Sequence, residues 1–172
     1  SYPKSEKLEE AIFMTAKCYY MLSPIHSLDQ KDTNIAIEKL QIFINNYPNS
    51  TYVQEANNLI SELQEKLEKK EFEISKQYYT IRDYKAAIRS VDNFIGEFAG
   101  TKYREEAMYY KFLSSYEIAI NSIQSKKIER LKDLKQLHSS IIKYYPETIF
   151  LEQLSSIMLI VEKEINTFAQ IN

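Results

Sequence analysis

The chain has 172 residues, of which 44% are hydrophobic and 27% are charged, a composition typical of a folded globular domain. Its formal net charge of −2 gives no support to nucleic-acid binding, which a strongly basic domain would favour. The single cysteine, Cys18, excludes an internal disulfide. The sequence contains neither a run of roughly 18 apolar residues, as a membrane span requires, nor a recognisable signal peptide.

The scarcity of turn-forming residues predicts an all-α fold. Only two glycines and four prolines occur, whereas a β-rich protein needs turn residues at intervals of about 8–12 positions. Apolar residues at helical spacing predict about seven helices. Their expected ranges are 5–22, 33–46, 51–82, 84–97, 102–125, 127–144 and 148–169.

Taken in chain order, the first helix places Cys18 on an apolar stripe with Met14 and Leu22, which predicts a small core residue. The segment 23–32 that follows is longer than the roughly 2–8 residues usual between helices, which makes it a candidate contact site. The helix expected over 51–82 is unusually long. One polar gap, Lys69-Lys70-Glu71, leaves a break near residue 70 as the alternative to a continuous helix.

Four short segments recur at roughly 50-residue intervals, a period that indicates stacked helical repeats. They are Tyr2-Pro3-Lys4-Ser5, Tyr47-Pro48-Asn49-Ser50, Phe98-Ala99-Gly100-Thr101 and Tyr145-Pro146-Glu147-Thr148. In each, an aromatic residue ends one helix, Pro or Ala-Gly prevents its continuation, and Ser or Thr is the expected N-cap of the next helix. Nine positions after each aromatic residue a contact between helices is expected, at Ala11, Ala56, Ala107 and Leu154.

This pattern predicts a single domain over 1–172, a right-handed solenoid of tetratricopeptide-like helix hairpins. The chain starts inside a repeat, at 2–5. We therefore expect it to be the C-terminal fragment of a longer protein, with any signal peptide or lipid-anchored cysteine upstream.

The residues that enzymes use are not gathered into a recognisable motif. The two histidines, His26 and His138, lie far apart in different repeats. Neither a metalloprotease helix motif, nor a Cys-x-x-Cys pair, nor a glycine-rich phosphate loop occurs. His26 is expected to be solvated in its loop and His138 to be partly buried. The sequence thus predicts a protein that is not an enzyme and uses no metal or cofactor.

Three stretches resemble the BamD family of outer-membrane lipoproteins. They are 36–56 around Tyr47-Pro48-Asn49-Ser50, the run from Tyr78-Tyr79 through Tyr84-Lys85-Ala86-Ala87-Ile88, and 100–107 together with 121–131. The second is similar to the family's Y-Y-x-x-x-x-x-Y-x-A-A-I pattern. The third, together with 23–30, is similar to the Bacteroidetes branch of the family. The resemblance covers nearly the whole chain.

The resemblance implies a non-catalytic scaffold subunit of the β-barrel assembly (BAM) complex, lipid-anchored at the periplasmic face of the outer membrane. Its expected partners are the POTRA domain of the barrel subunit BamA, other BAM lipoproteins and unfolded outer-membrane proteins. An alternative is a tetratricopeptide adaptor that binds peptide segments of another complex. A scaffold for a different envelope assembly is a third possibility.

Two groups of residues are candidates for protein binding. The first, Arg82, Tyr84 and Arg89, lies beside the A-A-I run; Ser90 stands where proteobacterial members carry an arginine that contacts BamA. The alternative is that these residues have no binding role, with Tyr84 closing a turn and the arginines solvated. The second group is basic and lies in the third stretch, where a solvated helix start is the alternative. It comprises Arg104, Lys126, Lys127 and Arg130.

Overall fold

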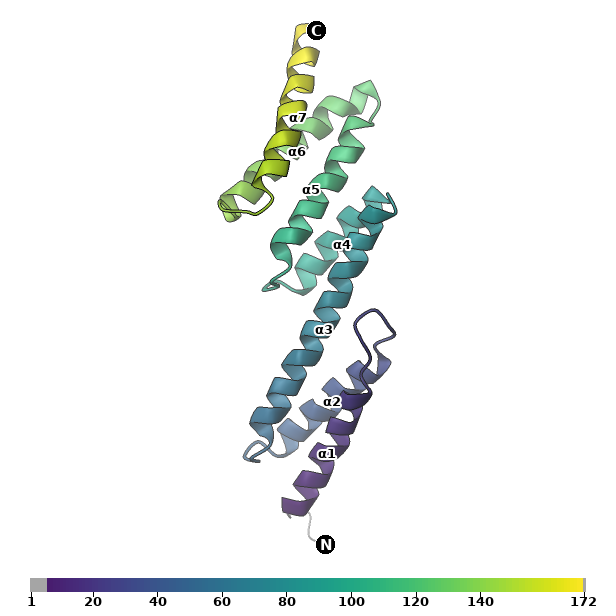
Figure 1. Ribbon diagram of the computed structural model, residues 1–172, viewed down its shortest axis with the longest axis vertical. Helices are drawn as coiled ribbons and strands as arrows, with labels where there is room; N and C mark the ends of the chain where they lie inside the picture. Colours follow the sequence, from purple (N-terminus) through teal and green to yellow (C-terminus); the bar gives the residue numbers. More distant parts are fainter. Residues whose placement is uncertain (1–5, 172) are drawn as a thin grey trace. The chain divides into compact units, whose positions relative to one another are not determined.

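The protein is described here by a computed structural model that covers residues 6–171 (Figure 1). Within them the chain forms seven helices and no strand. The helices are α1 (Glu6–Leu22), α2 (Lys31–Asn46), α3 (Val53–Thr80), α4 (Tyr84–Glu97), α5 (Arg104–Ile120), α6 (Gln124–Tyr144) and α7 (Leu151–Ile171). Successive helices pack as hairpins, consistent with a tetratricopeptide-like solenoid, so the predicted all-α repeat fold is confirmed. The first predicted turn, 2–5, lies outside the described residues.

The chain divides into two compact units, residues 1–70 and 71–172. Helix α3 runs without interruption from Val53 to Thr80, so the break considered near residue 70 does not occur. The grouping of all residues into one domain stays a prediction.

In the first unit, α1, α2 and the first part of α3 enclose a core of large apolar side chains. Phe13 and Phe43 are fully buried, with their ring centroids 5.4 Å apart, and the ring of Tyr52 stacks on Phe13 at 4.8 Å. Leu40 and Leu63 are also fully buried. Aromatic pairs at these distances stabilise a core beyond the area that they bury.

The second unit repeats this arrangement. Tyr103 stacks on Phe72 at 4.9 Å and Phe150 stacks on Tyr109 at 4.1 Å. Tyr52, Tyr103 and Phe150 each follow a predicted turn, so the same stacking occurs in three successive repeats. Around these pairs, buried aliphatic and aromatic residues of α4 to α7 complete the core. They include Val91, Phe94, Phe112, Leu131, Leu134, Ile141, Leu154 and Val161.

The Ser and Thr residues predicted as N-caps do not cap the helices that follow them. Helices α3, α5 and α7 begin three residues after Ser50, Thr101 and Thr148. Each hydroxyl instead accepts a hydrogen bond from the backbone N–H two residues later, and each carbonyl accepts one from the first helical residue. These residues therefore form a polar turn that leads into the helix, rather than its cap.

The predictions for Cys18 and Ala11 were wrong, since both side chains are exposed. The buried face of α1 carries Phe13 and Ala16, which face α2 and α3. Cys18 belongs to a second apolar stripe, with Met14 44% exposed, that no described helix covers. By contrast, Ala56, Ala107 and Leu154 are fully buried, as the repeat pattern predicts.

Candidate functional site

The turn between α3 and α4 holds the first group of predicted binding residues. The N–H of Arg82 donates to the carbonyl of Tyr79, and the N–H of Asp83 donates to that of Tyr78. This pair of bonds is a Schellman motif, which requires a left-handed residue after the helix. Arg82 takes that conformation, with φ 64°, and is the one described residue other than glycine with positive φ. Glycine usually occupies such a position, so the arginine here is strained.

Helix α4 starts immediately after this turn. The side chain of Asp83 caps it by accepting a hydrogen bond from the N–H of Ala86 at 3.1 Å. Tyr84, its first residue, is partly buried, with its ring centroid 5.8 Å from that of Tyr79. Arg89 is exposed and makes no hydrogen bond or ion pair with any described residue. It is therefore free to bind a partner.

Ser90 has a structural role at the position of the family arginine. Its hydroxyl lies 2.8 Å from that of Ser75, which is 1% exposed on α3. The contact joins α3 to α4 inside the second unit, so Ser90 is occupied in packing.

Tyrosines gather behind the turn. The rings of Tyr79 and Tyr110 lie 5.4 Å apart, and those of Tyr109 and Tyr110 lie 5.7 Å apart. Burial raises the pKa of Tyr79, with a further contribution from the negative charge of Glu117. Burial likewise raises the pKa of Tyr109. These phenols therefore remain neutral near neutral pH.

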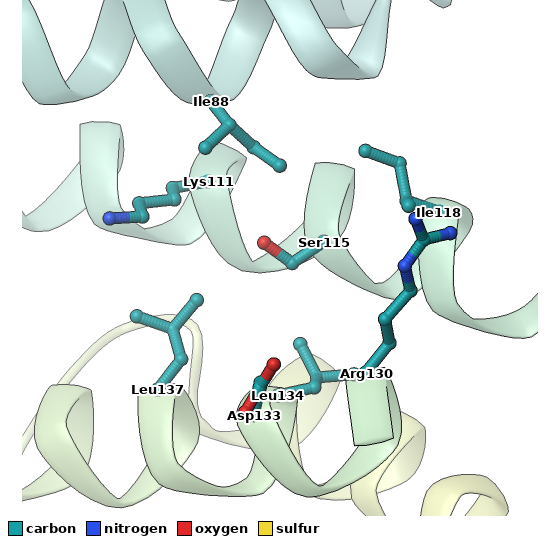
Figure 2. A pocket seen from close by; sticks show the side chains of 8 residues that line it. All are labelled: Ile88, Lys111, Ser115, Ile118, Arg130, Asp133, Leu134 and Leu137. Carbon is teal, nitrogen blue, oxygen red and sulfur yellow. The ribbon is translucent and has the colours of Figure 1, made fainter. Parts of the chain in front are cut away.

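A cavity of about 310 Å³ lies on α4, α5 and α6 (Figure 2). Four aliphatic residues, Ile88, Ile118, Leu134 and Leu137, contribute to its walls. Four polar residues also line it, namely Lys111, Ser115, Arg130 and Asp133. An apolar hollow with a few polar groups around it suits one apolar side chain of a partner.

Two of the polar residues are already engaged. The Lys111 ammonium lies 2.5 Å from the Asp92 carboxylate, and the Arg130 guanidinium donates to the hydroxyl of Ser122. Asp133 is exposed and has no partner among the described residues. The cavity therefore offers one unpaired carboxylate and one guanidinium whose charge is not neutralised by an ion pair.

The four basic residues predicted as a second group make different contacts and do not form one cluster of free charges. Lys127 forms an ion pair with Glu164 of α7 at 2.9 Å, and Arg104 donates to the carbonyl of Ala99 at 3.2 Å, closing the turn before α5. Lys126 is exposed. Within this group, Arg130 is the residue that lines the cavity.

A family comparison matches two overlapping parts of the chain, residues 1–89 and 75–169, to a family described as outer membrane lipoprotein, YfiO. The chain belongs to this outer-membrane lipoprotein family. A comparison with curated proteins gives no match. In the described part of the chain, no helix is long and apolar enough to cross a membrane. The same residues contain no group of three or more His, Cys, Asp or Glu that could hold a metal ion.

The family matches overlap at 75–89, the segment that contains the strained turn and the start of α4. Arg82, Tyr84 and Arg89 all lie in it, within 10 residues of the cavity residue Ile88 in sequence. The cavity was not predicted from the sequence, because Ile88 is one of many apolar residues at helical spacing and the carboxylate of Asp133 is one of many surface charges.

Proposed function

We propose that this protein is a BamD-type subunit of the outer-membrane β-barrel assembly complex, of the Bacteroidetes-type branch. The observation that supports the proposal best is the family match over residues 1–89 and 75–169. In this role the protein is a non-catalytic scaffold. It sits at the periplasmic face of the outer membrane, held by a lipid on the full-length protein, and helps to deliver or fold barrel substrates with other lipoproteins of the complex.

We propose that the turn and first helical turns of α4 contact the POTRA domain of a BamA-like subunit. Arg82 and Arg89 are exposed and Tyr84 is half-buried in the same turn and helix, and arginine and tyrosine are both enriched at interface hot spots. Strain in a residue such as Arg82 is retained where the side chain has a use that offsets its cost. Arg130, which lines the same cavity as Ile88 of α4, and the exposed Lys126 would then act at the edge of this contact. Arg104 and Lys127 keep the roles described above, in the turn before α5 and in the ion pair with Glu164.

A second candidate function is a tetratricopeptide adaptor that binds peptide segments of another complex. The cavity on α4, α5 and α6 supports it, because its volume of about 310 Å³ suits one apolar side chain of an extended peptide. The unpaired Asp133 would select a basic residue beside that side chain. The two candidates differ in the partner that is recovered from membranes.

The test is affinity purification of the tagged full-length protein from membranes. Recovery of a large β-barrel subunit with POTRA domains supports the proposal. Arg89→Glu should abolish that recovery, whereas Lys39→Glu, which reverses an exposed charge on α2, should leave it unchanged. Recovery of an unrelated complex with no barrel subunit would contradict the proposal and favour the adaptor.

A further inference from the structure

The end of α1 and the loop that follows it expose large aliphatic side chains close together in the sequence. Met21 is 76% exposed, Leu22 62%, Ile25 65% and Leu28 56%. These four residues, which we name the aliphatic tip, lie at the end of α1 and in the loop that joins it to α2 in the first unit; Figure 1 shows this loop. We propose that the aliphatic tip is a lipid-contact surface that inserts into the head-group layer of a phospholipid bilayer.

The inner side of this loop is polar and fully engaged. Gln30, 5% exposed, donates from its Nε2 to the carbonyls of Ile25 and Leu28, both at 2.9 Å. Its Oε1 accepts from the hydroxyl of Thr33, which is fully buried, at 2.7 Å. Polar side chains thus lie inside the loop and apolar side chains lie outside it, the reverse of the order usual in a globular protein. These hydrogen bonds hold the backbone of the loop while the side chains of Ile25 and Leu28 remain exposed.

Two lysines of α3 form hydrogen bonds with the loop. The Lys66 ammonium donates to the hydroxyl of Ser23 at 2.7 Å, and the Lys70 ammonium donates to the carbonyl of Leu28 at 2.5 Å. The carbonyls of Ile25 and Leu28 therefore find their partners within the protein. Backbone groups that enter an apolar medium must be satisfied in this way, because lipid chains cannot replace water as hydrogen-bond partners.

The chemistry of the tip favours lipid over a protein partner. Protein hot spots are enriched in Trp, Tyr and Arg and contain few leucines, and the loop 23–30 has none of those three residue types. Among the described residues, neither Lys66 nor Lys70 has a carboxylate partner, and the loop has a single carboxylate, Asp29. Their positive charges are therefore not neutralised by an ion pair, and such charges beside an apolar tip match the anionic head groups of phosphatidylglycerol.

The inference rests on membership of the outer-membrane lipoprotein family, which places the full-length protein at a bilayer. It does not depend on which barrel subunit the second unit binds. A tip that inserts shallowly would fix the orientation of the first unit against the membrane, in addition to the lipid anchor proposed above. An experiment can therefore refute the lipid contact of the tip without refuting the proposed binding of a barrel subunit, and the reverse.

Tryptophan fluorescence tests the proposal directly, because the chain contains no tryptophan and one introduced residue is the sole reporter. With the 172-residue chain and vesicles of phosphatidylethanolamine and phosphatidylglycerol, Leu28→Trp should shift its emission to the blue and be quenched by brominated lipid chains. The control is Ile149→Trp at an 81% exposed site of the second unit, which should show neither effect. Emission from Leu28→Trp that is unchanged by vesicles would overturn the proposal.

A binding measurement provides the second arm. The double variant Ile25→Ser with Leu28→Ser should lower the vesicle partition coefficient of the chain by about a hundredfold or more, because each replacement removes several buried methylene equivalents. The matched variant Ile149→Ser with Leu159→Ser, at 81% and 70% exposed sites, should partition as the wild type does. Equal losses in both double variants would overturn the assignment to the tip. Both variants should still recover the barrel subunit, which separates this result from a failure of the proposed function.

Discussion

Replacing Arg82 with glycine separates the structural and functional roles of the α3–α4 turn. Arg82 is exposed and its backbone has φ 64°, so the conformation is unfavourable for any side chain with a Cβ. The Schellman hydrogen bonds from Arg82 and Asp83 to the end of α3 use only backbone atoms, so they persist in the variant. We therefore expect Arg82→Gly to fold, with the guanidinium group as its one lost functional group.

The size of the effect follows from two opposing terms. Relief of the left-handed conformation stabilises the folded state by about 1–2 kcal/mol. The greater backbone freedom of glycine in the unfolded chain costs about 0.4–1 kcal/mol. The net expectation for Arg82→Gly is a change in the free energy of unfolding between about zero and a gain of about 1.6 kcal/mol.

Urea unfolding followed by circular dichroism measures this change, and binding to the barrel subunit is measured on the same variant. The account predicts a protein that is at least as stable as the wild type and binds less. Arg82→Asn is the control, since asparagine tolerates the left-handed region but has no positive charge. A loss of stability in Arg82→Gly would refute the reasoning, because it would mean that contacts of the guanidinium, rather than the backbone, hold the turn.

Two further predictions concern the core and the pH dependence. Phe13→Ala should lower the free energy of unfolding by about 3–5 kcal/mol, since its ring is fully buried, whereas Met14→Ala, at a 44% exposed site, should change it by less than about 0.5 kcal/mol in the same urea assay. Burial lowers the pKa of His138, and the negative charge of Glu162 partly opposes this shift. The unfolded state therefore binds more protons than the folded state at pH values between the two pKa values. The free energy of unfolding should fall as the pH drops below about 6.5, the ordinary pKa of histidine, toward the lower pKa of the folded state. His138→Phe should remove this contribution, and an identical pH profile in wild type and variant would contradict it.

The repeat fold could be predicted because three turns have the same local chemistry. The aromatic residues Tyr47, Phe98 and Tyr145 each donate their backbone N–H to the carbonyl four residues earlier and end α2, α4 and α6. Such signals are local in sequence, so they do not depend on the rest of the structure. Helix α4 was accordingly predicted with its observed bounds, Tyr84–Glu97.

Errors arose where side chains compete with the helix backbone. Helix α5 ends at Ile120, five residues before the predicted end, because the amide of Asn121 and the hydroxyl of Ser122 bond to carbonyls four residues earlier. The same polar residues also fit a continuing helix, so the sequence did not distinguish the two outcomes.

The site was less predictable than the fold. The strain of Arg82 depends on a backbone conformation that its neighbours in the sequence do not reveal, and the cavity depends on the spacing of three helices. Cys18 was assigned to the wrong face because α1 has two apolar stripes, and one of them remains exposed. Periodicity shows that a stripe exists but not which neighbour covers it.

The most direct test of the central claim is a titration of the purified chain with the purified periplasmic POTRA domains of the BamA-like subunit from the same organism, followed by calorimetry. The account predicts saturable binding that Arg89→Glu and Arg82→Gly both weaken by at least about tenfold, as expected for charged interface anchors, while Lys39→Glu leaves it unchanged. Absence of binding by the folded wild-type chain, or equal binding by all three variants, would contradict it.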